Sequence, residues 1–173
     1  MKRAPIALFY GSSTCYTEMA GEKIRQILGE AKVDVFNIAD TPIVEAEFYD
    51  CVILGIPTWD YGELQEDWDE IWDDLDHINW QGKKVALYGL GDQIGYPEWF
   101  LDAMGYLHAK VVKLGAIACG YWPNQGYDFE TSKALINDDQ QFVGLALDDE
   151  NEFDLSEQRI TTWCAQITHE FGL

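Results

Sequence analysis

The amino-acid sequence predicts an α/β protein: a doubly wound, five-stranded parallel sheet with helices on both faces and a long insertion splitting the last strand. Short apolar runs alternate with segments of helical periodicity, a pattern typical of parallel strands joined by right-handed helical crossovers. Polar loops rich in hydroxyl groups or glycine follow three of these runs, where such a sheet has its ligand crevice. The 173 residues, 47% of them hydrophobic, suit a single domain spanning 1–173.

Five apolar runs are the expected strands, because they are short and rich in β-branched or aromatic residues. They cover residues 6–10, 33–38, 51–56, 84–88 and 116–121. Apolar residues recur at helical spacing in four further segments. These are 18–28, 68–75, about 99–114, and 154–171, where Asp154 and Glu157 suit a capping box.

One segment breaks the alternation of strands and helices. Residues 122–136 are polar and lack periodicity, and a strand pattern returns at 142–147. We therefore expect an insertion at about 122–141 that divides the final strand. Loops of this length are often functional or flexible, so a docking or a packing role is open.

The charge of the chain is strongly negative, at −20. Between Lys32 and Lys83 there are fourteen Asp and Glu residues and no Lys or Arg. This distribution argues against binding to nucleic acid or anionic membranes and favours partners with a basic face. The commoner meaning of acidic runs, a solvated surface that aids solubility, is the alternative.

Cysteine and histidine usage gives no sign of a metal site or a disulfide framework, because the four cysteines and three histidines are scattered without ligand-like spacing. A reducing cytoplasm fits this usage. The apolar run after Lys2 and Arg3 ends at Gly11, too early for a signal peptide or a membrane span. We therefore expect a soluble cytoplasmic protein.

Hydroxyl side chains crowd the turn between the first strand and the first helix, in the segment Gly11-Ser-Ser-Thr-Cys-Tyr-Thr17. Free backbone N–H groups and the positive end of the helix dipole converge in such a turn, so it can bind phosphate without lysine. Neither a Walker loop nor a dinucleotide fingerprint is present. Simple helix capping is the alternative explanation.

Two further loops follow neighbouring strands and should meet the first at the carboxyl edge of the sheet. One is Pro57-Thr-Trp-Asp-Tyr-Gly62, and the other is Gly89-Leu-Gly-Asp-Gln-Ile-Gly-Tyr96. An anion cradle beside two aromatic loops suits a planar aromatic cofactor with a phosphate tail, since rings can stack and amides can hold the tail.

These motifs, with Phe142-Val-Gly-Leu-Ala-Leu-Asp148, resemble those of the long-chain flavodoxins in order and spacing over essentially the whole chain. The resemblance implies FMN as cofactor. It implies a phosphate loop of Ser12, Ser13, Thr14, Tyr16 and Thr17 with the backbone of Cys15. It places the flavin ring between Trp59 and Tyr96, with Asp92 at its pyrimidine edge and Asp60, Tyr61 and Gly62 facing N5. The implied set is completed by Pro57, Thr58, Leu90 and Gly91, with Asp148 near the ribityl chain.

Cys15 and Tyr16 depart from the family pattern, in which most members have Gly followed by a small polar or basic residue. This departure resembles the second, B-type subgroup of bacterial long-chain flavodoxins. A cysteine at a helix N-terminus can be reactive, but a packed thiol is the favoured expectation.

The resemblance implies a monomeric electron carrier without substrate turnover, reduced by a basic NADPH-dependent flavoprotein reductase of the ferredoxin-NADP+ type. The acidic surroundings predict a low-potential carrier that shuttles between semiquinone and hydroquinone, because added negative charge is disfavoured there. An FMN-dependent NAD(P)H:quinone reductase is the first alternative, since fold alone does not settle function. A phospho-acceptor receiver domain is the second.

Overall fold

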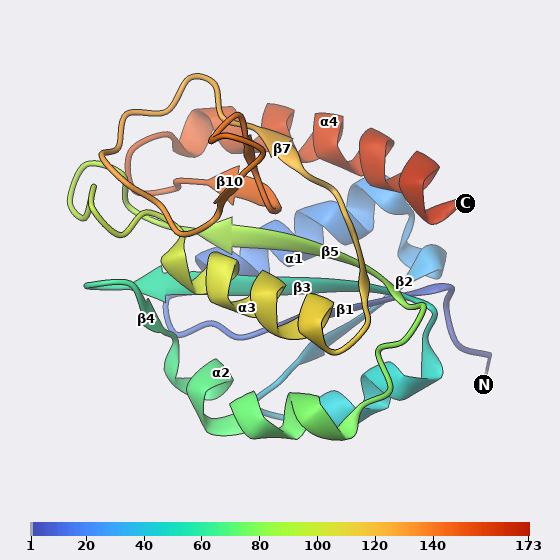
Figure 1. The fold of residues 1–173 in the computed structure, drawn as a ribbon. Helices are drawn as coiled ribbons and strands as arrows, with labels where there is room; N and C mark the ends of the chain where they lie inside the picture. Colours follow the sequence, from blue (N-terminus) through green and yellow to red (C-terminus); the bar gives the residue numbers. More distant parts are fainter. Residues whose placement is uncertain (1) are drawn as a thin grey trace.

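The computed structural model describes residues 2–173 and has a parallel sheet at its centre (Figure 1). The strands are β1 (Ile6–Tyr10), β2 (Val33–Asn37), β3 (Cys51–Trp59), β5 (Lys84–Leu90) and β10 (Leu145–Leu147), in the spatial order β10-β5-β3-β1-β2. All neighbours on this path are parallel. The doubly wound sheet predicted from the alternation of apolar runs and helical segments is confirmed.

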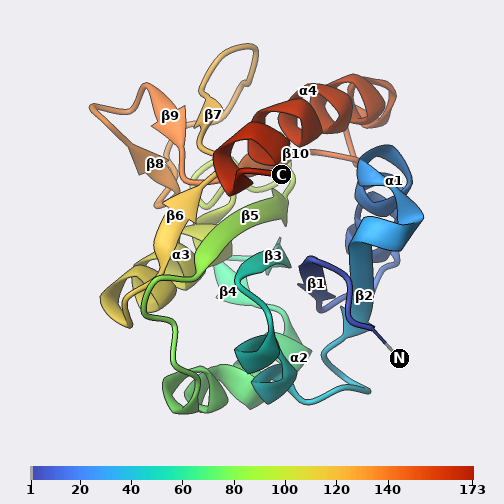
Figure 2. The same ribbon diagram turned by 90° about the vertical axis from the view of Figure 1, so that its right-hand side faces the viewer.

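Helices cover both faces of the sheet (Figure 2). α1 (Tyr16–Leu28) and α4 (Phe153–Phe171) pack on one face, where their apolar stripes join strand residues such as Leu8 and Ile53 in one core cluster. α2 (Glu66–Ile71), the 3-10 segment η3 (Trp72–His77) and α3 (Asp102–Lys113) pack on the other, around Trp68, Leu87 and Leu107. Two further 3-10 segments, η1 (Glu30–Lys32) and η2 (Ile43–Phe48), flank β2. Among the helices of residues 2–173, none is long and apolar enough to cross a bilayer.

The last strand is split as predicted. β6 (Ile117–Cys119) pairs with the first half of β5 and β10 with its second half. Between them, β7 (Trp122–Pro123), β8 (Leu135–Ile136) and β9 (Gln141–Phe142) form a small antiparallel sheet. Tyr127 fastens this insertion to the core: its hydroxyl donates to the carbonyl of Ala146 at 2.6 Å and accepts from the indole of Trp122 at 2.9 Å.

Three local expectations differ from the structure. The segment 57–59 belongs to β3 and turns into the short antiparallel strand β4 (Glu63–Leu64), instead of forming a loop. The second helix changes to 3-10 geometry at Trp72. α4 starts at Phe153 after Glu152, which makes no side-chain cap, so the capping box of Asp154 and Glu157 is wrong. Packing against the sheet, rather than local cap chemistry, fixes this helix start.

A half-buried histidine links α3 to the start of the insertion. A ring nitrogen of His108 lies 2.9 Å from the hydroxyl of Tyr121, and burial lowers the pKa of this imidazole. The unfolded chain therefore binds the proton more readily, and stability is lost as pH falls through the unfolded-state pKa of about 6.5 toward the lower folded-state pKa.

We expect His108→Gln to lose less unfolding free energy than the wild type between about pH 7 and about pH 5, measured by urea unfolding. His77 is exposed, so His77→Gln should follow the wild type. Equal losses in the wild type and His108→Gln would contradict this prediction.

Candidate functional site

The hydroxyl loop between β1 and α1 contains one residue with a left-handed backbone. Cys15 adopts the left-handed conformation (φ 73°) immediately before the helix begins at Tyr16. The hydroxyls of Ser12 and Thr17 are buried, and neither has a hydrogen-bond partner among residues 2–173. Buried hydroxyls are normally hydrogen-bonded, so these two side chains are unspent donors that an acceptor atom could satisfy.

The floor of this loop is fixed by two buried side chains. The indole of Trp68 donates to the carbonyl of Gly55 at 2.9 Å, and the hydroxyl of Tyr88 donates to the carbonyl of Thr17 at 2.8 Å. Gly11 lies directly on Trp68: a Cβ there would be 2.8 Å from Cδ1 of the indole. The loop therefore depends on the core cluster beneath α2.

The turn between β3 and β4 is the second component of the site. Asp60 and Gly62 have positive φ angles, 43° and 86°. A Cβ at Gly62 would lie 2.8 Å from Oδ2 of the buried Asp102, so glycine is required there by both conformation and space. Thr58 ties the same strand to α3 by accepting the Ala103 N–H at 3.0 Å.

The loop after β5 is shaped by the Asp92 carboxylate. Oδ1 accepts the N–H groups of Ile94 and Gly95, at 3.2 and 2.7 Å, and the side-chain amide of Asn151 at 2.8 Å. These bonds turn the loop so that Tyr96, 37% exposed, stands at the mouth of the site. The ring of Tyr61 makes an edge contact with Tyr96, with centroids 6.2 Å apart.

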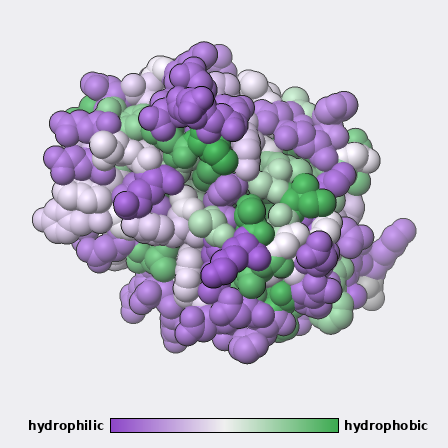
Figure 3. Space-filling model, viewed as in Figure 1, coloured by the Kyte–Doolittle hydropathy of each residue, from purple (hydrophilic) through white to green (hydrophobic). Residues whose placement is uncertain are grey.

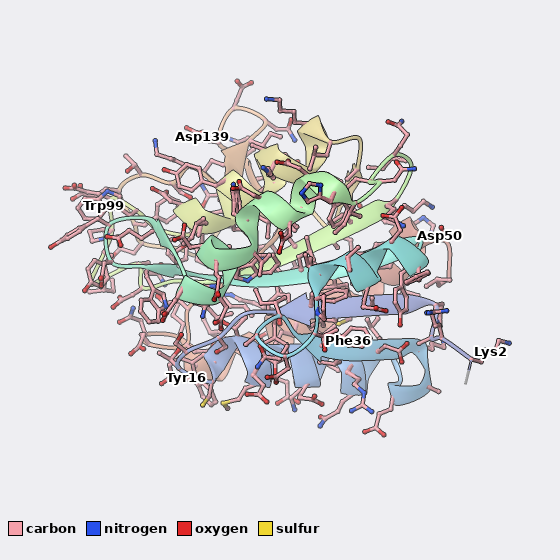
Figure 4. All side chains as sticks on the ribbon, turned by 90° about the horizontal axis from the view of Figure 1, so that it is seen from below. Lys2, Tyr16, Phe36, Asp50, Trp99 and Asp139 are labelled. Atoms are coloured by element: carbon pink, nitrogen blue, oxygen red, sulfur yellow. The ribbon has the colours of Figure 1, made fainter. Side chains whose placement is uncertain are left out.

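The three loops enclose a cavity of about 210 Å³ at the carboxyl edge of the sheet. Tyr16 and Trp99 lie at this end of the molecule, opposite Lys2 and Asp50 (Figure 4). The lining residues are Thr14, Tyr16, Pro57, Thr58, Trp59, Asp60, Leu90, Gly91, Asp92, Tyr96, Asp149 and Glu150. The structure therefore brings together ten of the residues that the sequence predicts for the site.

Negative charge dominates the cavity. Four carboxylates and no Lys or Arg line it. The effect is visible at Tyr96, whose pKa is raised chiefly by the neighbouring Asp60 carboxylate. Burial raises the pKa of Asp149, whose carboxyl accepts the hydroxyl of Ser156. Additional negative charge on any group in this cavity is therefore energetically disfavoured.

The other predicted residues lie beside the cavity rather than on its wall. Ser12, Ser13, Cys15 and Thr17 form the hydroxyl loop. Tyr61 is largely exposed, and Gly62 is buried behind the turn. Asp148 is fully buried, and its carboxylate accepts N–H groups of Gln93 and Asn151, so it holds the neighbouring loops together. The thiol of Cys15 is exposed, which corrects the expected packed thiol: the left-handed backbone turns it to solvent.

Sequence reasoning missed Asp149 and Glu150 on the cavity wall and Gln65 beneath the hydroxyl loop. The signal for the two acids was their position directly after the last strand. Gln65 lies three residues after the Pro57-Thr-Trp-Asp-Tyr-Gly62 motif, but nothing in the sequence shows that its side chain reaches residue 13. A larger hollow of about 660 Å³ lies between Leu64, Trp72 and Tyr106, and Gly62 is the one predicted site residue among those that line it.

Comparison with known proteins places this architecture in a family. The family model described as Flavodoxin matches residues 8–163. The chain is a member of the flavodoxin family. The protein named Flavodoxin 2 from Escherichia coli (strain K12) is 59% identical over 167 residues, 96% of each chain. The flavodoxin of Synechococcus elongatus is 52% identical over 171 residues, 98% of this chain and 99% of that one.

Solved structures agree with this membership. The Fusobacterium nucleatum flavodoxin bound to flavin mononucleotide superposes with a TM-score of 0.90 at 33% identity, over 95% of this flavodoxin and 97% of that chain. The family membership predicted from the loop motifs is confirmed.

Proposed function

We propose that this flavodoxin binds FMN and works as a low-potential one-electron carrier without substrate turnover of its own. The observation that carries the proposal is the acidic, aromatic cavity that adjoins a loop with two orphaned buried hydroxyls. The FMN-bound relative from Fusobacterium nucleatum supports the choice of cofactor.

The residues present fit FMN. Ser12, Thr17 and the backbone N–H groups at the start of α1 would hold the phosphate, since an uncharged loop at a helix N-terminus favours an anion. Trp59 and Tyr96 would flank the ring. When bound, FMN supplies one-electron chemistry, and the couple between its singly and doubly reduced states is the one we assign to this protein.

The side chains of the site set the potential. Asp60, Asp92, Asp149 and Glu150 surround the cavity, so electrons added there meet a negative field. The Asp60 carboxylate raises the pKa of Tyr96, and the same field would disfavour negative charge on a bound ring and so lower its reduction potential.

Stepwise dithionite reduction of the purified protein, followed by absorption spectroscopy, tests this function. We expect one FMN per chain and a blue, singly reduced species at intermediate reduction. A colourless protein that takes up no flavin would refute the proposal. Steady oxidation of NADPH with a quinone by the protein alone would instead support a quinone reductase.

The electron donor we propose is a basic NADPH-dependent flavoprotein reductase. Exposed carboxylates along α2 and η3 support a basic partner: they belong to Glu66, Asp69, Glu70, Asp73, Asp74 and Asp76. Hydrophilic side chains prevail at the lower part of this face, where α2 lies, and hydrophobic patches show across its middle (Figure 3). Such a field accelerates weak, transient encounters with a basic face.

We predict that reduction by such a reductase slows by about tenfold or more between about 10 mM and about 500 mM salt, because screening removes the steering. Stopped-flow rates measured across this series check the prediction. Direct reduction by dithionite serves as the control: its reducing species is itself an anion, so screening of the acidic surface should not slow it. A partner rate that does not change with salt would remove electrostatic steering from the account.

The finer assignments extend the same proposal. The identity with proteins named Flavodoxin 2 supports membership of the B-type subgroup. We propose a monomer with one domain over 1–173, acting in the cytoplasm.

A further inference from the structure

A buried glutamine connects the acidic helix α2 to the hydroxyl loop. Gln65 lies between β4 and α2 and is fully buried. It occupies the N-cap position of α2, yet its side chain makes no cap bond to that helix. Instead its Nε2 donates to Oγ of Ser13 at 3.0 Å, across 52 residues of sequence. Gln65 thus makes no bond to its own helix and instead binds a hydroxyl of the distant loop, which indicates that it has a role in that loop.

The same amide nitrogen also donates to Oδ2 of Asp67 at 2.8 Å. Both N–H bonds of the amide are then used, and they orient it, while its buried Oε1 has no partner among residues 2–173. The carboxylate strengthens the arrangement, because hydrogen bonds to an ionised acceptor are the stronger class. The result is a chain of contacts from Asp67 through Gln65 to Ser13.

This chain determines what the Ser13 hydroxyl can do. A hydroxyl has one hydrogen and two lone pairs, and here one lone pair is occupied by the amide of Gln65. The hydrogen is thereby directed away from the amide and remains available as a donor. Ser13 is exposed on the loop that also contains the orphaned hydroxyls of Ser12 and Thr17. A donor held in advance binds an anion without a further loss of rotational freedom.

We propose that Gln65 is a positioning residue for the phosphate group, acting through Ser13. This assignment rests on the proposed function. It concerns only the phosphate end of the cofactor, because Gln65 does not line the cavity that would hold the ring.

The test compares two flavins with the same ring, FMN and riboflavin, by fluorescence titration of the apoprotein. We expect Gln65→Leu and Ser13→Ala each to weaken FMN binding by about tenfold. The FMN affinity of the double variant should lie within about twofold of that of the weaker-binding single variant, because both changes break the same chain of hydrogen bonds. Riboflavin affinity should stay within about twofold in all three.

Matched variants separate positioning from general damage to the fold. Gln65→Glu keeps the size of the side chain but replaces the donor by an acceptor, so it should weaken FMN binding at least as much as Gln65→Leu. The matched control is Gln166→Leu, near the C-terminal end of α4. It removes a comparable hydrogen bond, from the side-chain amide of Gln166 to the carbonyl of Tyr121 at 2.8 Å, and should leave the affinities for FMN and riboflavin unchanged.

The assignment would be overturned by additive losses in the double variant, by equal losses for FMN and riboflavin, or by wild-type FMN affinity in both Gln65 variants. A wild-type protein that binds riboflavin and FMN equally would also overturn it. A wild-type protein that binds neither flavin would refute the proposed function itself.

Discussion

Replacing Thr17 by valine is expected to weaken FMN binding by about 2 kcal/mol and to stabilise the apoprotein by about 1 kcal/mol. The Thr17 side chain is fully buried, and its hydroxyl has no partner within residues 2–173. Without ligand, that hydroxyl bears the cost of desolvation, which the isosteric valine removes. With ligand, it would donate to a charged phosphate, and this bond is lost in the variant.

The experiment is decisive because FMN affinity should fall while the stability of the apoprotein rises. Urea unfolding of the apoprotein gives the stability change, and flavin titration gives the affinity change. Thr168→Val is the control, because its hydroxyl already donates to the carbonyl of Cys164 at 2.7 Å and lies far along α4 from the loop. The control should not gain stability or lose FMN affinity. Stability and affinity falling together in Thr17→Val would show that the hydroxyl is structural.

Trp68→Ala is expected to lower the unfolding free energy by about 3 to 5 kcal/mol. The indole is fully buried between α2 and the sheet, and its truncation leaves a large cavity and an unpaired carbonyl at Gly55. Because Gly11 rests on the same ring, the variant should also bind FMN at least about tenfold more weakly.

Urea unfolding and flavin titration again measure the two effects. Trp68→Phe keeps most of the apolar volume and loses the N–H donor, so its stability should lie between those of the wild type and Trp68→Ala. Trp72→Ala, at a half-buried position on η3, should cost less than half as much as Trp68→Ala and leave FMN affinity unchanged. Stability losses of equal size at the two tryptophans would contradict the packing described here.

The fold could be predicted because the strands are buried on both faces. Continuous apolar runs such as 6–10 and 51–56 are distinct from the amphipathic helices between them, and parallel order follows from their alternation. Prediction was poorer where tertiary contacts override local signals. Thr58 and Trp59 extend β3 because β4 folds back on them, and this pairing has no short-range sequence signal.

The site was predictable to the same extent and for a related reason. Residues that follow strands must meet at the carboxyl edge, so Thr14, Trp59 and Tyr96 come together by topology. Contacts that depend on side-chain direction were out of reach. Asp148 points into the protein while the next residue, Asp149, lines the cavity, and the reach of Gln65 to Ser13 requires coordinates.

The split strand has a consequence for how this protein could be shortened. Cys119 lies opposite Ala86, and Leu145 lies opposite Tyr88, so only one residue of β5 separates the two pairing segments. A single residue joining 119 to 145 would restore an unbroken edge strand. Residues 120–144 could therefore be replaced by one residue without altering the register of the sheet, which would give a shorter version of this flavodoxin.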